Sequence, residues 1–146
     1  MKETEGFKEA HERMRPGHIT AQGFLGADGR PLADIVARDE GEFRRLGLTF
    51  EGVAAELRRL RDEGRRGLGE PITVGGAVVT VGDARGLLPC PWDDGTFHKD
   101  SVAVERGGTR IVYSDLSIHM LERHHFCQGE GSAFRLDPGA LKRVVG

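Results

Sequence analysis

Two pairs of adjacent glycines, at positions 75–76 and 107–108, constrain the fold of this chain more than any other feature. Each pair is flanked by alternating apolar residues, a pattern typical of β-hairpins with two-residue turns. In the first hairpin Val74 faces Ala77, and the apolar side chains then lie on one side of both strands. These side chains belong to Ile72, Val74, Ala77, Val79 and Val81. One face of the hairpin is therefore suited to burial.

The second glycine pair predicts a hairpin with the same kind of register. Its facing residues are Val102 with Tyr113, Val104 with Ile111, and Glu105 with Arg110. The last of these pairs is a cross-strand ion pair. Two such hairpins predict a four-stranded antiparallel sheet.

Three helical segments precede the strands. A short one lies within residues 1–15, and we expect residues 1–18 to be loosely attached because they are terminal and charged. A second covers residues 31–47, and a third begins at the N-cap Thr49 and runs to about Arg66. The last two are expected to pack as an antiparallel helical hairpin on the sheet. Because the helices precede the strands in a block, the predicted fold class is α+β.

The C-terminal part of the chain adds further elements. Ser114 is the expected N-cap of a helix that runs from residue 115 to about 125 and crosses the sheet. Residues 134–136 are expected to form a short extended piece, and residues 140–145 a final helical turn. We therefore expect residues 1–146 to form a single α+β domain.

Charge and hydropathy restrict the partners and the compartment. The 21 Lys and Arg residues are balanced by 23 Asp and Glu residues, so we do not expect nucleic acid as a partner. No apolar run reaches the roughly 18 residues that span a bilayer, and the first residues lack the apolar stretch of a signal peptide. We expect a cytoplasmic protein that does not bind a membrane. In that compartment Cys90 and Cys127 are expected to be free thiols, the alternative being one disulfide between them.

The segment 88–98, between the two hairpins, is the part of the chain richest in reactive side chains. It contains Cys90, Trp92, Asp93, Asp94 and His98. Prolines on both sides of Cys90 restrict its backbone and hold the sulfur in a fixed direction. A loop of this length within a domain is more often functional or folded on itself than idle. The alternative is that its aromatic side chains cover the end of the sheet and its Asp-Gly step only forms a turn.

Histidines give a second indication of chemistry. Four of the six fall in one stretch with a cysteine on each side, namely His98, His119, His124 and His125. Imidazole and thiolate are usual ligands of zinc. On a helix His119 and His124 are about 140° apart, so they do not share a face as the ligand pairs of helical zinc enzymes do. A zinc site would therefore combine His98 from the loop with His119 and His124, the alternative being that His124 only caps the helix end.

Cys90 is also a candidate nucleophile. A cysteine attacks at neutral pH when a nearby imidazole lowers the pKa of its thiol, and His98 or His119 could supply that imidazole. In this alternative Cys90, His98 and Asp94 form the catalytic group of a small hydrolase or transferase. A water activated by zinc on the histidines is the other form of the enzyme alternative.

The expected site lies where three segments converge: the loop 88–98, the helix with His119, and the loop 127–135. Its polar rim for a ligand consists of Trp92, Asp93, Arg123 and Arg135. We expect a small module that binds a small molecule or a protein partner, with zinc as the candidate cofactor. An enzyme is the alternative, because no complete catalytic motif is present.

Overall fold

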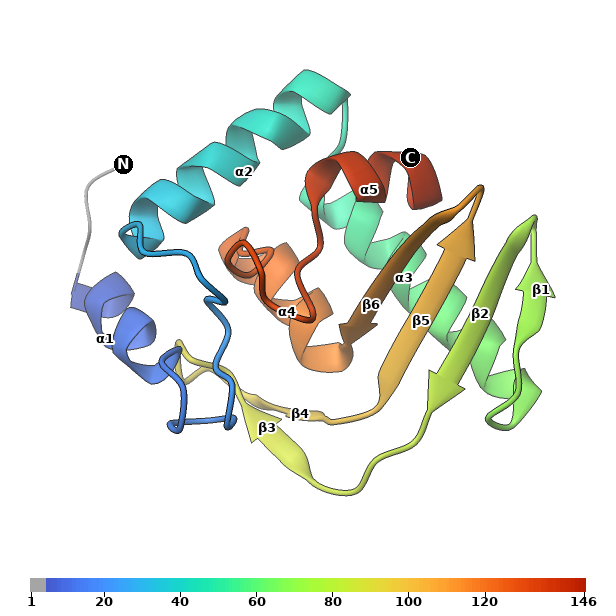
Figure 1. Cartoon of the computed structure of the whole chain (residues 1–146), viewed down its shortest axis with the longest axis horizontal. Helices are drawn as coiled ribbons and strands as arrows, with labels where there is room; N and C mark the ends of the chain where they lie inside the picture. Colours follow the sequence, from blue (N-terminus) through green and yellow to red (C-terminus); the bar gives the residue numbers. More distant parts are fainter. Residues whose placement is uncertain (1–4) are drawn as a thin grey trace.

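A computed structural model describes residues 5–146 and is built on a four-stranded antiparallel sheet with the strand order β1-β2-β5-β6 (Figure 1). The strands are β1 Ile72–Val74, β2 Ala77–Gly82, β5 Ser101–Arg106 and β6 Thr109–Ser114. All facing pairs predicted for the two hairpins are present, so both registers are confirmed, but within residues 5–146 Glu105 and Arg110 form no ion pair. In the first turn φ is 53° at Gly75 and 85° at Gly76, a conformation that glycine adopts without strain.

Between β2 and β5 the chain leaves the main sheet. Residues 83–100 contain a second, two-stranded sheet formed by β3 (Leu87–Pro89) and β4 (Thr96–His98). β2 and β5 themselves pair antiparallel, with Val79 opposite Val104. The segment rich in reactive side chains is therefore a hairpin that projects from the end of the main sheet (Figure 1).

Helices lie before and after the strands, which confirms the α+β class. They are α1 Glu5–Arg13, α2 Leu32–Leu46, α3 Phe50–Gly64 with a 3₁₀ turn at Arg65–Gly67, α4 Asp115–His124, and α5 Pro138–Val145. α3 packs on the sheet and on α4, whereas α2 packs on α5 and α1 (Figure 1). α2 and α3 meet at their joined ends, where the rings of Phe43 and Phe50 stack with centroids 3.9 Å apart. In the described part of the chain, no helix is long and apolar enough to cross a membrane.

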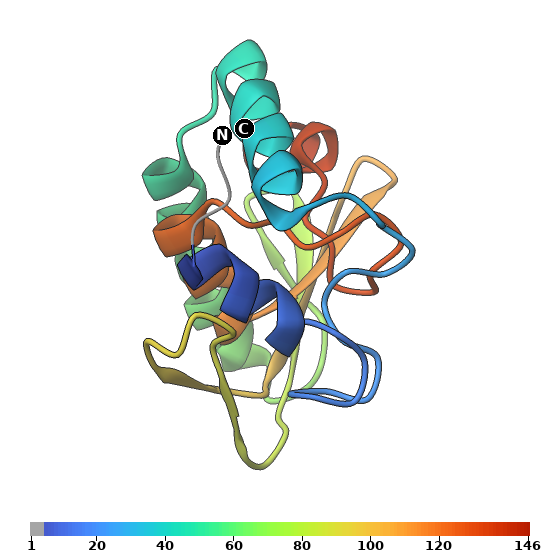
Figure 2. The same cartoon turned by 90° about the vertical axis from the view of Figure 1, so that its left-hand side faces the viewer.

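The N-terminal helix is anchored to the rest of the molecule. Its expected span was residues 1–15, of which residues 1–4 lie outside the described part of the chain. Ala10 and Met14 are fully buried in a core that α1 shares with α2 and α4. Figure 2 shows α1 in front of α4, between α2 and the β3–β4 hairpin.

The C-terminal segment departs from the expectation in one place. Residues 134–136 form no strand, and Phe134 lies in a turn that the N–H of Arg135 closes by donating to the carbonyl oxygen of Ser132. The final helix begins earlier than predicted. The Asp137 side chain caps it by accepting a hydrogen bond from the N–H of Ala140 at 3.0 Å.

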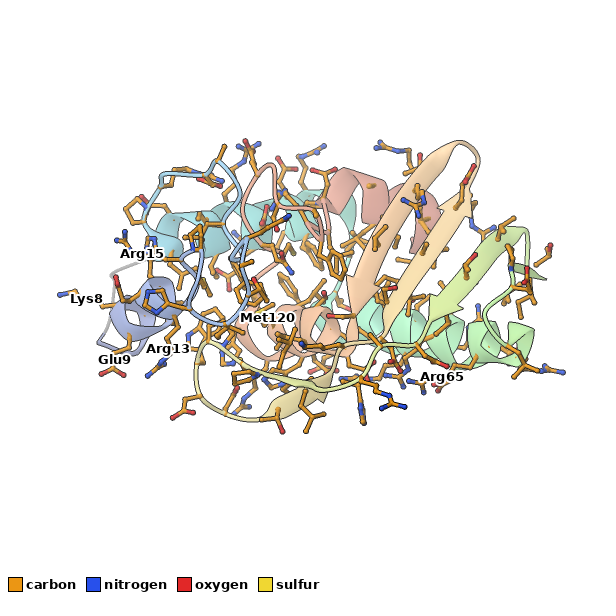
Figure 3. All side chains as sticks on the ribbon, turned by 60° about the horizontal axis from the view of Figure 1, so that its bottom comes forward. Lys8, Glu9, Arg13, Arg15, Arg65 and Met120 are labelled. Carbon is orange, nitrogen blue, oxygen red and sulfur yellow. The ribbon has the colours of Figure 1, made fainter. Side chains whose placement is uncertain are left out.

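Two hydrophobic cores hold the elements together. The larger one lies between the main sheet and the helices α3 and α5, and it includes Cys127. The second lies between α1, α2, α4 and the β3–β4 hairpin, and it includes Cys90. Both cysteines are free and buried. Figure 3 shows the side chain of Met120 in the interior, whereas Arg15 and Arg65 extend outward.

Candidate metal centre

The tip of the β3–β4 hairpin is a tight turn over residues 90–95. The N–H of Cys90 donates to the carbonyl oxygen of Gly95 at 2.9 Å, and the N–H of Asp93 donates to the carbonyl oxygen of Cys90 at 2.8 Å. Asp93 and Gly95 have positive φ values of 60° and 155°, which reverse the chain within a few residues. The turn brings the side chains of Cys90 and Asp94 close together, facing α4.

α4 supplies the other half of the site. It begins with a capping box, in which the Ser114 hydroxyl accepts from the N–H of Ser117 and the Ser117 hydroxyl accepts from the N–H of Ser114. Both serines are buried, so the start of the helix is fixed. The helix ends at His124, and His125 follows in the left-handed conformation. α4 therefore presents His119 from its middle and His124 from its last position.

The two histidines converge on Asp94. The Nε2–H of His119 donates to Asp94 Oδ1 at 2.9 Å, and the Nε2–H of His124 donates to Oδ2 at 2.7 Å. The imidazoles leave the helix in different directions, but the carboxylate joins them because each of its oxygens binds one ring. One potential ligand atom from each of four residues lies within 4.8 Å of the other three. These residues, Cys90, Asp94, His119 and His124, form what we call the Cys-Asp-His cluster.

Aromatic side chains hold both imidazoles in place. Trp92 stacks on His124 with centroids 4.0 Å apart and planes within 6°, and Phe97 stacks on His119 at 4.3 Å and 26°. The edge of Phe126 contacts Trp92 from another side. The imidazole side chains remain 18% exposed at His119 and 16% at His124. The stacks restrict ring rotation, so the Nε2 atoms stay directed at the cluster.

Burial and hydrogen bonds determine the protonation of the cluster. Burial raises the pKa of the Asp94 carboxyl, but the hydrogen bonds from the thiol and both imidazoles outweigh it and hold this pKa well below its usual range. Burial raises the pKa of the Cys90 thiol to about 12, and its hydrogen bond to Asp94 adds to the effect. Burial also lowers the pKa of His124, although Asp94 opposes this shift. At neutral pH the cluster therefore contains a carboxylate, a protonated thiol and a neutral His124 imidazole.

Two of the three predicted zinc ligands, His119 and His124, belong to the cluster, and the third, His98, does not. His98 follows Phe97 on β4, and successive side chains of a strand point to opposite faces. Because Phe97 stacks on His119, His98 points away from the cluster and is exposed. The hairpin turn contributes a thiol and a carboxylate to the cluster instead.

Three of the predicted rim residues lie on the hairpin turn and on α4. Trp92 covers one ring of the cluster through its stack on His124. Asp93 is exposed at the turn, and Arg123 is exposed on α4. Trp92 therefore shapes the cluster, whereas the two charged side chains face solvent.

The third segment expected at the site, the loop after α4, is held elsewhere. The Arg135 guanidinium donates to the buried Asp39 carboxylate at 3.0 and 3.1 Å and to the carbonyl oxygen of Gln128 at 2.6 Å. The N–H of Gly129 donates to the carbonyl oxygen of Phe24 at 3.0 Å. These bonds tie the loop to α2 and to the segment after α1. Arg135 is 13% exposed and engaged in this network.

No protein-family model, curated protein or solved structure matches this chain. We therefore infer the chemistry of the cluster from the types of its four side chains. Thiolate, carboxylate and imidazole are the ligand types of four-coordinate zinc sites, and other late first-row divalent ions accept the same set. Once the thiol is ionised, the two anionic groups balance the charge of one divalent ion.

Proposed function

We propose that this chain is a small metal-binding module that holds one Zn²⁺ ion through Cys90, Asp94, His119 and His124. The observation that carries the proposal is the meeting of these four side chains, from two distant segments, within 4.8 Å. In this role the ion ties the β3–β4 hairpin to α4. We also propose a cytoplasmic location, because both cysteines are free and thiols are kept reduced in that compartment.

The distances support a four-coordinate ion after a small adjustment. Zinc bonds of about 2.0–2.3 Å in a tetrahedron place neighbouring ligand atoms roughly 3.3–3.8 Å apart. The contacts of Asp94 with His119 and His124 are shorter, 2.9 and 2.7 Å, because each carries a proton between nitrogen and oxygen. When zinc binds Nε2, each imidazole carries its proton on Nδ1 instead, so the carboxylate has to retreat by roughly half an ångström.

Four protein ligands favour a structural role over catalysis. Structural zinc sites are closed by four side chains, whereas catalytic sites keep one position for water. The nucleophile alternative receives no support, since Cys90 is 1% exposed and burial raises the pKa of its thiol to about 12. A binding module with a structural metal is therefore our preferred function.

Metal content tests the proposal directly. The full chain, produced without a histidine tag and passed through a desalting column after zinc loading, should retain about one zinc per molecule by elemental mass spectrometry. His119→Gln should lose most of this zinc, and the matched variant His98→Gln should keep it, because His98 lies outside the cluster. Protein that retains no zinc, or equal loss in both variants, would overturn the proposal.

Cobalt substitution identifies the sulfur ligand. Co²⁺ bound in this cluster should show the charge-transfer absorption of a cobalt–thiolate bond. Cys90→Ser should lose that absorption, whereas Cys127→Ser should keep it because Cys127 belongs to the other core. An unchanged spectrum in Cys90→Ser would exclude Cys90 as a ligand.

A further inference from the structure

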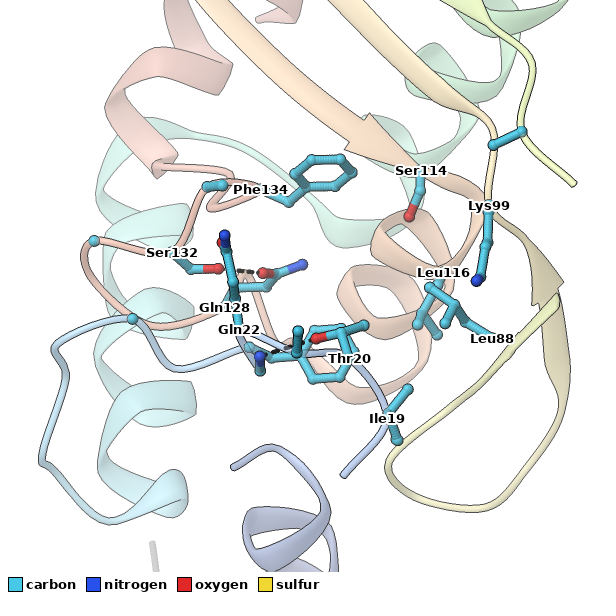
Figure 4. Close-up of a pocket in the computed structure, with 17 residues that line it drawn as sticks. Ile19, Thr20, Gln22, Leu88, Lys99, Ser114, Leu116, Gln128, Ser132 and Phe134 are labelled. Carbon is cyan, nitrogen blue, oxygen red and sulfur yellow. Dashed lines mark hydrogen bonds between the residues drawn. The ribbon is translucent and has the colours of Figure 1, made fainter. Parts of the chain in front are cut away.

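A cavity of about 570 Å³ lies apart from the Cys-Asp-His cluster, between residues 19–26, residues 128–134, β3 and the start of α4 (Figure 4). This volume is in the range of sites that bind small molecules. None of the four cluster residues lines the cavity. A ligand here would therefore be recognised by a different set of groups.

The walls of the cavity are largely apolar. Phe24 and Leu116 belong to the second core and are buried, and Leu88 packs against the same core. Phe134 extends over the opposite side of the opening (Figure 4). These side chains offer a surface for an aromatic or branched aliphatic group.

Gln128 contributes a buried hydrogen-bond donor that lacks a partner. The residue is 3% exposed, and its Oε1 accepts a hydrogen bond from the Ser132 hydroxyl at 2.6 Å. Within residues 5–146 the amide nitrogen of Gln128 has no acceptor, and Figure 4 shows it directed into the cavity. Buried donors without a partner are rare in folded proteins because each one costs free energy. A ligand with a hydrogen-bond acceptor at this point would satisfy it.

Lys99 contributes a positive charge at the other side of the cavity. It is the only charged residue in the lining, and in the described part of the chain its ammonium has no ion-pair partner. Its stem passes over Gly86, where a Cβ would meet Lys99 Cε at 3.7 Å. Figure 4 shows the ammonium near Leu88 and Leu116, across from Gln128. No carboxylate side chain lines the cavity, so Lys99 gives its lining a net positive charge.

From these observations we infer that the cavity is a binding site for a small organic monocarboxylate that has an apolar body and a carbonyl group. The carboxylate pairs with Lys99, the carbonyl oxygen accepts from the Gln128 amide, and the apolar body packs on Phe134 and Leu116. This inference does not depend on the metal, because the two sites share no side chain.

The test uses two probes that differ in one group: N-acetylphenylalanine and its neutral C-terminal amide. Each probe is titrated into the isotopically labelled full chain, and binding is followed by the chemical shifts of the backbone amides in the NMR spectrum. We expect shifts at Leu116 and Gln128, and a dissociation constant about fivefold lower for the carboxylate, a modest factor because Lys99 is exposed. Lys99→Met should abolish the difference between the probes, and the control Lys8→Met on α1 should preserve it.

A second variant tests the buried donor. Gln128→Glu keeps the shape of the side chain and its acceptor for Ser132 but replaces the amide donor, so both probes should bind at least about fivefold more weakly. Absence of shifts at the cavity with either probe at millimolar concentration, or equal affinity for both probes in the unmodified chain, would overturn the inference. The same result is expected with and without a chelator, so a failure here is separate from a failure of the zinc site.

Discussion

Cys90 shows how strongly its surroundings can change what a residue type does. Flanking prolines and the turn hydrogen bond to Gly95 fix its backbone, and its side chain lies in the second core. The same thiol that suggests a nucleophile in the sequence is held protonated beside Asp94 in the fold. A metal ion can displace that proton, whereas an organic electrophile has to reach the sulfur of a residue that is only 1% exposed.

Cys90 of the metal-free native protein should therefore react slowly with iodoacetamide. Because its thiol pKa is raised from 9.0 to about 12, the thiolate fraction at neutral pH is lower by roughly a thousandfold, and burial slows access further. Labelling rates are measured by peptide mass spectrometry in native buffer and in denaturant, with the buried Cys127 as the internal reference. Rapid native labelling at Cys90 would restore the nucleophile alternative.

At the scale of elements, local sequence patterns were sufficient to predict turns and helix caps, because a short stretch of chain determines these structures. The glycine turns fixed both hairpin registers, and Thr49 caps α3 by accepting from the N–H of Gly52 at 3.0 Å. The β3–β4 hairpin was not predicted, because its strands are three residues long and one of them ends in Pro89. The predicted packing of α2 along α3 is found only at their joined ends, because the apolar face of α2 packs on α5 and α1 instead.

Two helical glycines should respond in opposite directions to alanine. A Cβ on Gly64 would lie 2.5 Å from Val79 Cγ1 and 2.9 Å from Val81 Cγ2, so Gly64→Ala forces α3 away from β2. A Cβ on Gly41 in α2 meets its nearest atom at 3.8 Å. We expect Gly64→Ala to lower the free energy of unfolding by about 1–2 kcal/mol and Gly41→Ala to raise it by about 0.5–1 kcal/mol. Urea denaturation measures both, and equal effects would contradict the close contact at Gly64.

At the scale of the whole molecule, the Cys-Asp-His cluster depends on contacts that no local pattern contains. The residue types were available, and two imidazoles of the cluster were proposed as ligands from the sequence. Helical spacing alone argued against that pair, because the two positions lie on different faces of a helix. It does not reveal that each carboxylate oxygen of Asp94 accepts a hydrogen bond from one of the two imidazoles. His98 was drawn into the proposal by its position in the loop, and only the strand direction shows that it points away. Long-range packing, which brings the hairpin onto α4, supplies the missing information.

Zinc should stabilise the folded molecule as a whole, since the unfolded chain cannot hold the four ligands together. At a free zinc concentration of 100 times the dissociation constant, the gain is about 2.7 kcal/mol, which raises the melting temperature by about 5–10 °C. Thermal unfolding with zinc and with a chelator measures this gain. His119→Gln should show no difference between the two conditions, and His98→Gln should behave like the unmodified chain.

Zinc affinity should increase with pH. In the metal-free protein the Cys90 thiol has a pKa of about 12 and is protonated at neutral pH, so zinc binding releases its proton. The Asp94 carboxyl has a depressed pKa and is already ionised, so it releases none. One released proton weakens the binding about tenfold for each pH unit downward. Calorimetry at pH 8 in two buffers of different ionisation enthalpy counts the protons. A count near zero would show that the thiol does not bind the metal.

The placement of the cluster has a mechanical consequence. A bond from the ion to Cys90 and another to His124 would enclose β4, β5, β6 and α4 in a closed ring of chain. If the molecule is stretched from its two termini, the force then passes through the ion and bypasses everything inside the ring. The zinc-bound protein would extend by less than the metal-free protein. The difference is a contour length on the order of 100 Å, which is released only when a metal–ligand bond ruptures.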